Sequence, residues 1–300
     1  MWIELHIKTS ADNANTLGDQ LSLLGASAVT FQDSGDQPIY EPEPGNMPLW
    51  QDTTVVGPFD ETLPVKPILT YFEQQQATGQ ITNCSLQNLA DQDWERVCLQ
   101  HFKPIRCGKR LWICPSWHTP PKADAVNVIL DPGLAFGTGT HPTTALCLEW
   151  LDQNMSDEQE IIDYGCGSGI LGIAALKLGA SHVIAVDNDP QAIEATEKNG
   201  IKNHFQPPQL ETQLASDAND LLPADLVIAN ILAQPLIDLA PRLALLVKPK
   251  KRILLSGILL EQIDPVQEAY HTWIAWDKPS IKGEWACLAG TRTEGRTNKL

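Results

Sequence analysis

A glycine-rich segment at residues 161–172 has residue types and a spacing that could bind a nucleoside. It reads Ile-Ile-Asp-Tyr-Gly-Cys-Gly-Ser-Gly-Ile-Leu-Gly, with an apolar run at its start and a helix-forming run after it. Glycines let a backbone turn sharply and let a ligand lie against the chain without Cβ clashes. In doubly wound folds, the turn between the first strand and its helix binds such ligands. The segment therefore predicts a nucleoside-binding loop.

Two ligands fit this loop to different degrees. The stretch from Gly167 to Gly172 matches the dinucleotide pattern G-x-G-x-x-G, which is a weak signal alone. The stretch from Asp163 reads Asp-x-Gly-x-Gly-x-Gly, which makes Asp163, Gly165 and Gly167 candidate contacts. A carboxylate there would repel a pyrophosphate but attract the ammonium and sulfonium of S-adenosylmethionine (AdoMet). We therefore expect AdoMet, with an NAD-dependent oxidoreductase as the alternative.

Acidic residues end or follow the next predicted strands. Asp187 ends the strand Val183–Asp187, where a carboxylate can accept hydrogen bonds from both ribose hydroxyls of AdoMet or NAD. Asp189, just before Pro190, is better suited to cap the next helix. Asp217 follows the third strand and could bind an adenine amino group, although a plain turn role is equally open. Asp187 is therefore the predicted ribose ligand.

Asn230 ends the fourth predicted strand, Leu226–Asn230, after an apolar run. A polar side chain at this edge of a parallel sheet lies where such folds do their chemistry, although an Asn can also satisfy local backbone groups. Amino-group methyltransferases often carry Asn-Pro-Pro-aromatic here, whereas this chain has Asn-Ile-Leu-Ala. We predict that Asn230 is the catalytic residue that holds a substrate amine, and the missing aromatic leaves room for repeated methylation.

Alternating strands and helices must position these residues. From Val126 onward the pattern predicts a parallel sheet, and hence a doubly wound Rossmann-like AdoMet methyltransferase domain at residues 124–295. Residues 1–90 predict the order β-α-β-β-α-β of a small α+β ferredoxin-like domain. Residues 91–123, with Trp94, Trp112 and Trp117 among basic residues, predict a packed linker. The expected strands of the sheet are Ile161–Tyr164, Val183–Asp187, Leu210–Leu214, Leu226–Asn230 and Ile253–Ser256.

Composition excludes several classes of protein. The net charge of −16 argues against direct nucleic-acid binding. No apolar run is long enough for a membrane span, and no signal peptide is evident. Seven cysteines without a Cys-x-x-Cys pair predict no disulfide framework and no metal site, but thiols that fill the core of a cytoplasmic protein. Residues 1–90 carry eleven acidic and two basic residues, which indicates either a solubilising surface or a surface for a basic partner.

The segment Asn127–Thr144 reads Asn-Val-Ile-Leu-Asp-Pro-Gly-Leu-Ala-Phe-Gly-Thr-Gly-Thr-His-Pro-Thr-Thr and resembles the signature of the ribosomal protein L-eleven methyltransferase family. Arg110–Trp117, the glycine loop and Asn230–Ala233 are also similar to that family, so the resemblance covers nearly the whole chain. It implies a bacterial enzyme that trimethylates amino groups, on lysine side chains and possibly the N-terminus, of a basic large-subunit ribosomal protein. It also implies an N-terminal domain that recognises this substrate.

The resemblance also implies four cofactor contacts, at Thr144, Gly165, Asp187 and Asn230. Physical reasoning agrees for the first, because a glycine-rich loop that runs into a helix start offers N–H groups to the methionine carboxylate of AdoMet. His141 in this loop could be a ligand, a base or a plain loop residue. A non-catalytic binding module with an acidic adaptor domain is a third functional class.

Overall fold

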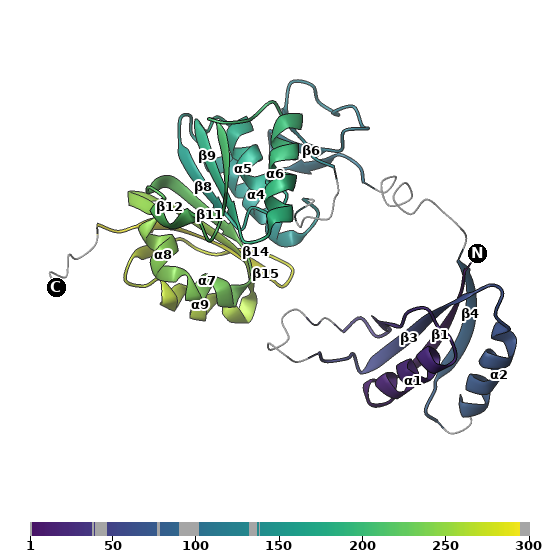
Figure 1. The fold of residues 1–300 in the computed structure, drawn as a ribbon. Helices are drawn as coiled ribbons and strands as arrows, with labels where there is room; N and C mark the ends of the chain where they lie inside the picture. The colour runs from purple at the N-terminus through teal and green to yellow at the C-terminus, as the bar shows by residue number, and fades with distance from the viewer. Residues whose placement is uncertain are drawn as a thin grey trace. The chain divides into compact units, whose positions relative to one another are not determined.

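The computed structural model describes residues 2–37, 39, 47–76, 79–89, 102–131, 137 and 139–294. The chain forms two compact units, Met1–Val97 and Cys98–Leu300 (Figure 1). No helix in the described ranges combines the length and the apolar character that crossing a membrane requires.

The first unit is an antiparallel sheet with two helices. The sheet order is β2-β3-β1-β4. The element order β-α-β-β-α-β predicted from the sequence is confirmed, and the ferredoxin-like classification stays a prediction. The elements are β1 (Trp2–Ser10), α1 (Ala11–Leu23), β2 (Thr30–Asp33), β3 (Asp52–Asp60), α2 (Val65–Gln76) and β4 (Asn83–Leu89).

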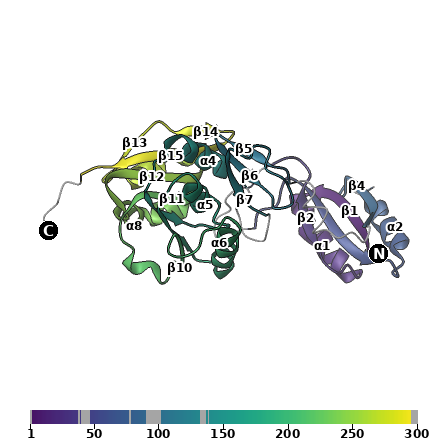
Figure 2. The same ribbon diagram turned by 90° about the horizontal axis from the view of Figure 1, so that it is seen from above.

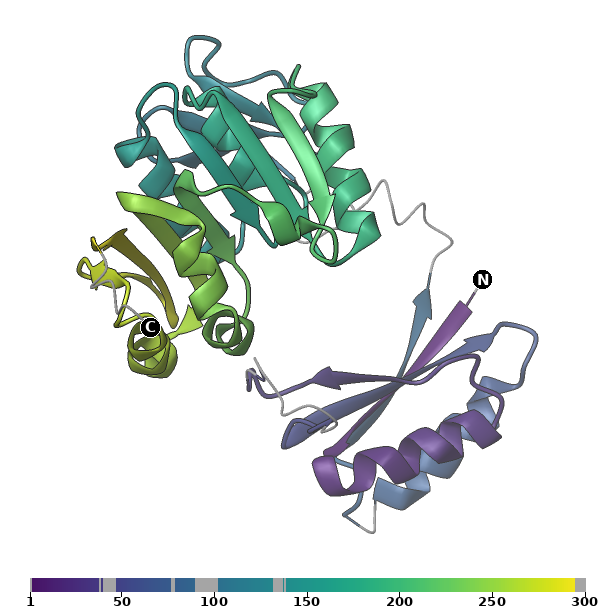
Figure 3. The same cartoon turned by 60° about the vertical axis from the view of Figure 1, so that its left-hand side comes forward.

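The core of the first unit lies between the sheet and both helices. Leu5 and Ile7 alternate along β1 with more exposed residues, so they share the inner face. They pack in one cluster with Leu17 of α1 and Phe72 of α2, which are helical residues on buried faces. Figure 3 shows the purple and blue helices side by side against one face of the sheet. Gly25, at φ +97°, follows the C-cap residue Leu24 and ends the first helical segment.

The second unit contains an eight-stranded sheet in the order β10-β9-β8-β11-β12-β15-β13, with β14 paired to β15. The first five strands are parallel, and each contains or closely matches a strand predicted from the sequence. The antiparallel strands β13 to β15, which the sequence analysis did not predict, extend the sheet beyond β12, and Figure 2 shows β10 and β13 at its opposite ends. The sheet strands are β8 (Glu160–Tyr164), β9 (His182–Asp187), β10 (Leu210–Leu214), β11 (Ala224–Asn230), β12 (Val247–Leu259), β13 (Ile274–Trp276), β14 (Ser280–Lys282) and β15 (Trp285–Arg292).

Helices cover both faces of this sheet, so the doubly wound fold is confirmed. Alternate residues along β8 point to opposite faces, with Ile161 in one core and Ile162 in the other. The first core includes residues of α4 and α5, and the second includes residues of α7, α8 and α9. The helices are α4 (Pro142–Asn154), α5 (Ile170–Lys177), α6 (Pro190–Lys202), α7 (Ala233–Asp238), α8 (Ala240–Leu245) and α9 (Ile263–Ala269), with short 3₁₀ turns η1 (Ala218–Asp220) and η2 (Leu260–Gln262).

Part of the predicted linker 91–123 belongs to the second unit. The strands β5 (Ile105–Cys107) and β6 (Leu111–Cys114) form a three-stranded sheet with β7 (Val126–Ile129). Cys107, Leu111 and Ile113 are buried in the same core as α4 and α5. The segment is therefore integral to this unit rather than a connector, while Trp94 lies outside the described residues. The functional division of the chain at residues 90 and 124 stays a prediction.

The side chain of Asn203 closes the outer edge of β7. Its Oδ1 accepts a hydrogen bond from the Ile129 N–H at 2.8 Å, and its Nδ2 donates to the Ile129 carbonyl at 2.7 Å. The Nδ2 also donates to the Asn199 carbonyl at 2.8 Å, and Asn203 is 1% exposed. The amide thus pairs with β7 as a neighbouring strand would, and it ties β7 to the end of α6.

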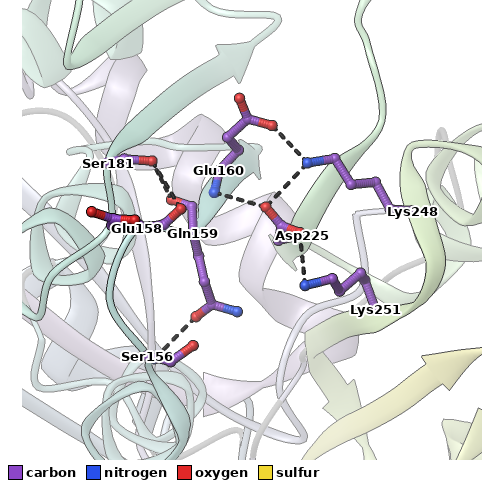
Figure 4. Close-up of polar contacts among 8 residues, drawn as sticks. All are labelled: Ser156, Glu158, Gln159, Glu160, Ser181, Asp225, Lys248 and Lys251. Atoms are coloured by element: carbon purple, nitrogen blue, oxygen red, sulfur yellow. Dashed lines mark hydrogen bonds and ion pairs between the residues drawn. The ribbon is translucent and has the colours of Figure 1, made fainter.

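A charged network joins the amino ends of β8, β11 and β12, at the edge of the sheet opposite to their carboxyl ends (Figure 4). Asp225 accepts from the Glu160 N–H at 3.1 Å and pairs with the Lys248 and Lys251 ammonium groups at 3.1 and 3.0 Å. Burial raises the pKa of Asp225, but these partners outweigh it and leave the pKa below its ordinary value. All four basic residues of the run 248–252 have acidic partners, in the pairs Lys248–Glu160, Lys250–Glu294, Lys251–Asp225 and Arg252–Asp277.

Candidate active site

The glycine loop lies between β8 and α5, at the carboxyl edge of the parallel strands, as the sequence predicted. Gly165 and Gly169 have φ angles of +80° and +77°, which strain any residue with a Cβ. A Cβ at Gly165 would lie 2.3 Å from the Ile231 side chain, and one at Gly169 would lie 2.8 Å from Thr196. Glycine is therefore required at both positions for space as well as for backbone conformation.

Side chains from α6 hold the loop in place. The Thr196 hydroxyl donates to the Gly167 carbonyl at 3.1 Å, and the Asn199 Nδ2 donates to the Ser168 carbonyl at 2.9 Å. The Ser168 hydroxyl in turn donates to the Gly137 carbonyl at 2.6 Å. The glycine loop is thus fixed to α6 on one side and to the segment before α4 on the other.

Asp187 ends β9 beside the glycine loop, as predicted. Its Oδ2 accepts from the Gly167 N–H at 2.9 Å, and its Oδ1 accepts from the Asp189 N–H at 3.0 Å. Each carboxylate oxygen can accept a second hydrogen bond, so both keep capacity for a ribose hydroxyl. Asp189 caps α6 by accepting from the Gln191 N–H at 2.8 Å, which confirms its predicted role. Asp187 therefore positions the loop in addition to any contact with a ligand.

Asp163 lies at the end of β8 and is only 1% exposed. Its Oδ2 accepts from the Gly172 N–H at 2.9 Å, whereas its Oδ1 has no hydrogen-bond partner among the described residues. Burial, with a smaller contribution from the Asp187 charge, raises the pKa of Asp163 to about 7. A buried carboxylate oxygen without a donor is costly, and a cation bound nearby would offset that cost.

The start of α4 meets the ends of β11 and β12. The Asn230 Nδ2 donates to the buried Thr144 hydroxyl at 3.3 Å, although the two residues are 86 positions apart in sequence. The Ser256 hydroxyl, three residues before the end of β12, donates to the Thr143 carbonyl at 3.2 Å. Thr144 and Asn230, which the sequence analysis proposed separately, are thus brought into contact at the edge that carries the glycine loop.

His141 is the N-cap of α4. Its side chain accepts from the Thr143 N–H, and its Nδ1 lies 2.8 Å from the Thr143 hydroxyl oxygen. Its ring also packs edge-on against the Trp285 ring, with centroids 4.9 Å apart. Burial lowers the pKa of His141, so the imidazole is neutral at pH 7. These contacts favour a positioning role over that of a base.

Other predictions have less support. Asp217 accepts from the Ser216 hydroxyl at 3.0 Å and lines a cavity of about 290 Å³ together with Asp220 and Ile184, so its adenine role stays a prediction. Pro132–Phe136 and Thr138 of the signature segment lie outside the described residues. The roles of Ser168, Ser256 and Trp285 could not be predicted from local sequence, because they depend on partners that are distant in the chain.

Comparisons with known proteins match nearly the full length of the chain to one family. The family model of the ribosomal protein L11 methyltransferase (PrmA) matches residues 1–293. The chain is 48% identical to a ribosomal protein L11 methyltransferase of Marinobacter nauticus over 98% of this chain and 99% of that protein. It is 49% identical to a protein of the same name from Shewanella denitrificans over 97% and 99% of the two chains.

A solved structure supports the same assignment. The crystal structure of a ribosomal protein L11 methylase from Lactobacillus delbrueckii subsp. bulgaricus is 34% identical, with a TM-score of 0.59, and the match covers 64% of this chain and 100% of that one. The oxidoreductase that the glycine loop left open finds no support in these comparisons. The chain belongs to the ribosomal protein L11 methyltransferase (PrmA) family.

Proposed function

We propose that this chain transfers methyl groups from AdoMet to amino groups of ribosomal protein L11, and that it adds three methyl groups to each amine. The observation that carries the proposal is the convergence of the glycine loop, Asp187 and the Thr144–Asn230 pair at one edge of the sheet. Membership of the family supports the same reaction and the same substrate protein.

The residues present fit AdoMet. Asp187 has acceptor capacity for two ribose hydroxyls, and it lies directly beside the glycine loop through its contact with the Gly167 N–H. The Oδ1 of Asp163, which has no hydrogen-bond partner among the described residues, suits a cationic ligand and would repel a phosphate. The segment before α4 and the start of that helix suit the methionine carboxylate. When bound, AdoMet supplies a methyl group on a positively charged sulfur.

Asn230 is the proposed catalytic residue. Because its Nδ2 donates to the Thr144 hydroxyl, its Oδ1 is left to accept a hydrogen bond from the substrate amine. Such a bond would aim the nitrogen lone pair and supply positioning, which is the main task of an enzyme in a direct transfer between two bound groups. Thr144 fixes the orientation of the amide, so we assign it a positioning role beside its proposed cofactor contact.

Deprotonation of the amine requires no dedicated base. A lysine amine with a reference pKa near 10.4 costs roughly 4–5 kcal/mol to deprotonate at pH 7. Desolvation in a closed site lowers that pKa and recovers part of this cost. The His141 imidazole is neutral, so it places no positive charge beside the amine. Its Nδ1 already contacts the Thr143 hydroxyl, which argues against a role as the base. We assign no residue as a general base.

We assign recognition of the ribosomal protein to the first unit. Residues 1–90 carry eleven acidic and two basic residues, and an acidic surface attracts a protein that must neutralise RNA phosphates. The basic run 248–252 does not suggest a nucleic-acid surface, because each of its basic side chains has an acidic partner within the chain. The substrate is therefore free ribosomal protein in the cytoplasm rather than RNA.

The test uses purified full-length protein, tritiated AdoMet and ribosomal protein L11 isolated from a strain that lacks this gene. Mass spectrometry should find three methyl groups on each modified amine. Binding of AdoMet without transfer to the ribosomal protein would support the non-catalytic alternative, and binding of NAD in place of AdoMet would support the oxidoreductase. Either result would overturn the proposal.

A further inference from the structure

Two aromatic rings form a corner beside the proposed amine site. The rings of His141 and Trp285 have centroids 4.9 Å apart and an interplanar angle of 69°, so they meet close to a right angle. His141 begins α4 and Trp285 begins β15, which places the two residues on different elements of the second unit. Both are partly exposed rather than buried. The proposed chemistry above does not require either ring.

The pairing register places this corner over the carboxyl edge of the sheet. Asn230 pairs with Ser256 on β12, and Trp285 pairs with Leu259, which is three residues further along the same strand. That offset corresponds to roughly 10 Å beyond the end of β11. His141 lies one helical turn before Thr144, whose hydroxyl contacts Asn230. The corner and the Asn230 amide therefore border the same space above the strands.

We propose that the His141–Trp285 corner is the subsite for the partly methylated ammonium group of the substrate. This inference rests on the proposed function. Monomethyl and dimethyl amines remain cations near neutral pH, and their alkyl groups weaken hydration, so aromatic faces attract them more effectively than a bare ammonium. The corner thus retains the substrate between successive transfers, and the proton of each ammonium leaves to solvent before the next N–C bond forms.

The missing aromatic after Asn230 supports this assignment. The chain has Asn-Ile-Leu-Ala where many amino-group methyltransferases carry Asn-Pro-Pro-aromatic. Ala233 takes the place of that aromatic residue, and its buried methyl group offers no π face to the substrate. Trp285 supplies an aromatic ring from β15 instead. His141 contributes a neutral ring that does not repel a cation.

The experiment compares Trp285→Leu with Trp285→Phe, which keeps an aromatic ring. The control is Trp117→Leu, because Trp117 is 42% exposed, packs near His118 with centroids 6.4 Å apart, and has no part in the proposed site. The readout is the ratio of trimethyl to monomethyl product on ribosomal protein L11 at low conversion, together with the rate of the first transfer. AdoMet affinity and thermal unfolding report whether each variant is intact.

Trp285→Leu should lower the product ratio about tenfold, a loss within the range that a cation–π contact supports, while the first transfer stays within about twofold. Trp285→Phe should lower the ratio about threefold, and it carries the test if the leucine variant does not fold. An unchanged ratio in both variants, or an equal fall in the first transfer, would overturn the inference. Failure of the wild-type protein to methylate the ribosomal protein would instead overturn the proposed function.

Discussion

Replacing Asp187 by Ala should have two separable effects, because this carboxylate already has two partners without a ligand. The Gly167 and Asp189 N–H groups would lose their acceptors at 2.9 and 3.0 Å. Leaving such groups unsatisfied costs about 1–3 kcal/mol each when water cannot replace the acceptor. Since Asp187 is 9% exposed, water recovers part of the loss, and the free energy of unfolding should fall by about 2–4 kcal/mol in total.

AdoMet affinity should fall at least tenfold in addition. The charge-assisted bonds to two ribose hydroxyls are worth about 1.5–3 kcal/mol each, whereas a tenfold loss corresponds to about 1.4 kcal/mol. Calorimetry would measure the Kd for AdoMet and for its 2′-deoxy analogue in the wild-type protein and in Asp187→Ala. If the Asp187 carboxylate binds the ribose, the wild-type protein should bind the 2′-deoxy analogue more weakly than AdoMet. Asp187→Ala should bind the two compounds with nearly equal affinity, because it has already lost the acceptor.

Asp189→Ala is the matched control, because it removes a carboxylate two residues away that caps α6. It should cost about 1 kcal/mol of stability, as is typical of a lost N-cap, with little change in the Kd for AdoMet. An unchanged Kd in Asp187→Ala would refute the ribose assignment and leave a purely structural role for this residue. The assignment would also be refuted if the loss of binding free energy from the substitution and the loss from the 2′-deoxy analogue were simply additive.

Three further predictions concern catalysis, domain function and pH. Asn230→Ala should lower kcat for the ribosomal protein by about tenfold or more while weakening AdoMet binding less, and a proportional fall in both would make Asn230 a cofactor residue only. A chain beginning at Phe102, which keeps β5 and β6, should still bind AdoMet but lose methylation of the ribosomal protein. The KM of the full chain for the ribosomal protein should rise with salt, because screening weakens the attraction between the acidic first unit and a basic substrate. Full methylation by the shortened chain would count against recognition by the first unit. Because burial raises the pKa of Asp163 to about 7, folding favours its protonated form, so its contribution to stability is present in acid and is lost as pH rises from about 4 through about 7. The Tm should therefore fall less steeply over this range in Asp163→Asn, and equal slopes in ligand-free wild-type and variant protein would contradict the assigned pKa.

The local part of the site could be predicted from the sequence. Asp163, Gly165, Gly167 and Asp187 lie at strand ends or in one tight turn, so their positions follow from the alternation of strands and helices. The N-cap at Asp189 was predictable for the same reason, because its partner Gln191 is two residues away. Short-range patterns thus defined the cofactor end of the site.

The remaining parts of the structure depend on long-range pairing. Asn230 meets Thr144 only after the parallel sheet has formed, and Trp285 meets His141 through strands β14 and β15 that the sequence analysis did not predict. The strand β6 was assigned to a linker because its tryptophan and basic neighbours obscured a short buried run. Five of the six described cysteines fill the core as predicted, whereas Cys98 lies outside the described residues.

The two hydrogen bonds between the Asn203 amide and β7 restrict which residues can replace Asn203 in a protein that still folds. Aspartate could not donate to the Ile129 carbonyl, serine could not span both groups, and glutamine would overshoot by a methylene. Because Asn203 is buried, a residue that leaves either group of Ile129 without a partner would destabilise this unit and promote aggregation. Such changes would first be noticed as insoluble protein during expression, even where every residue that touches the substrate is unaltered.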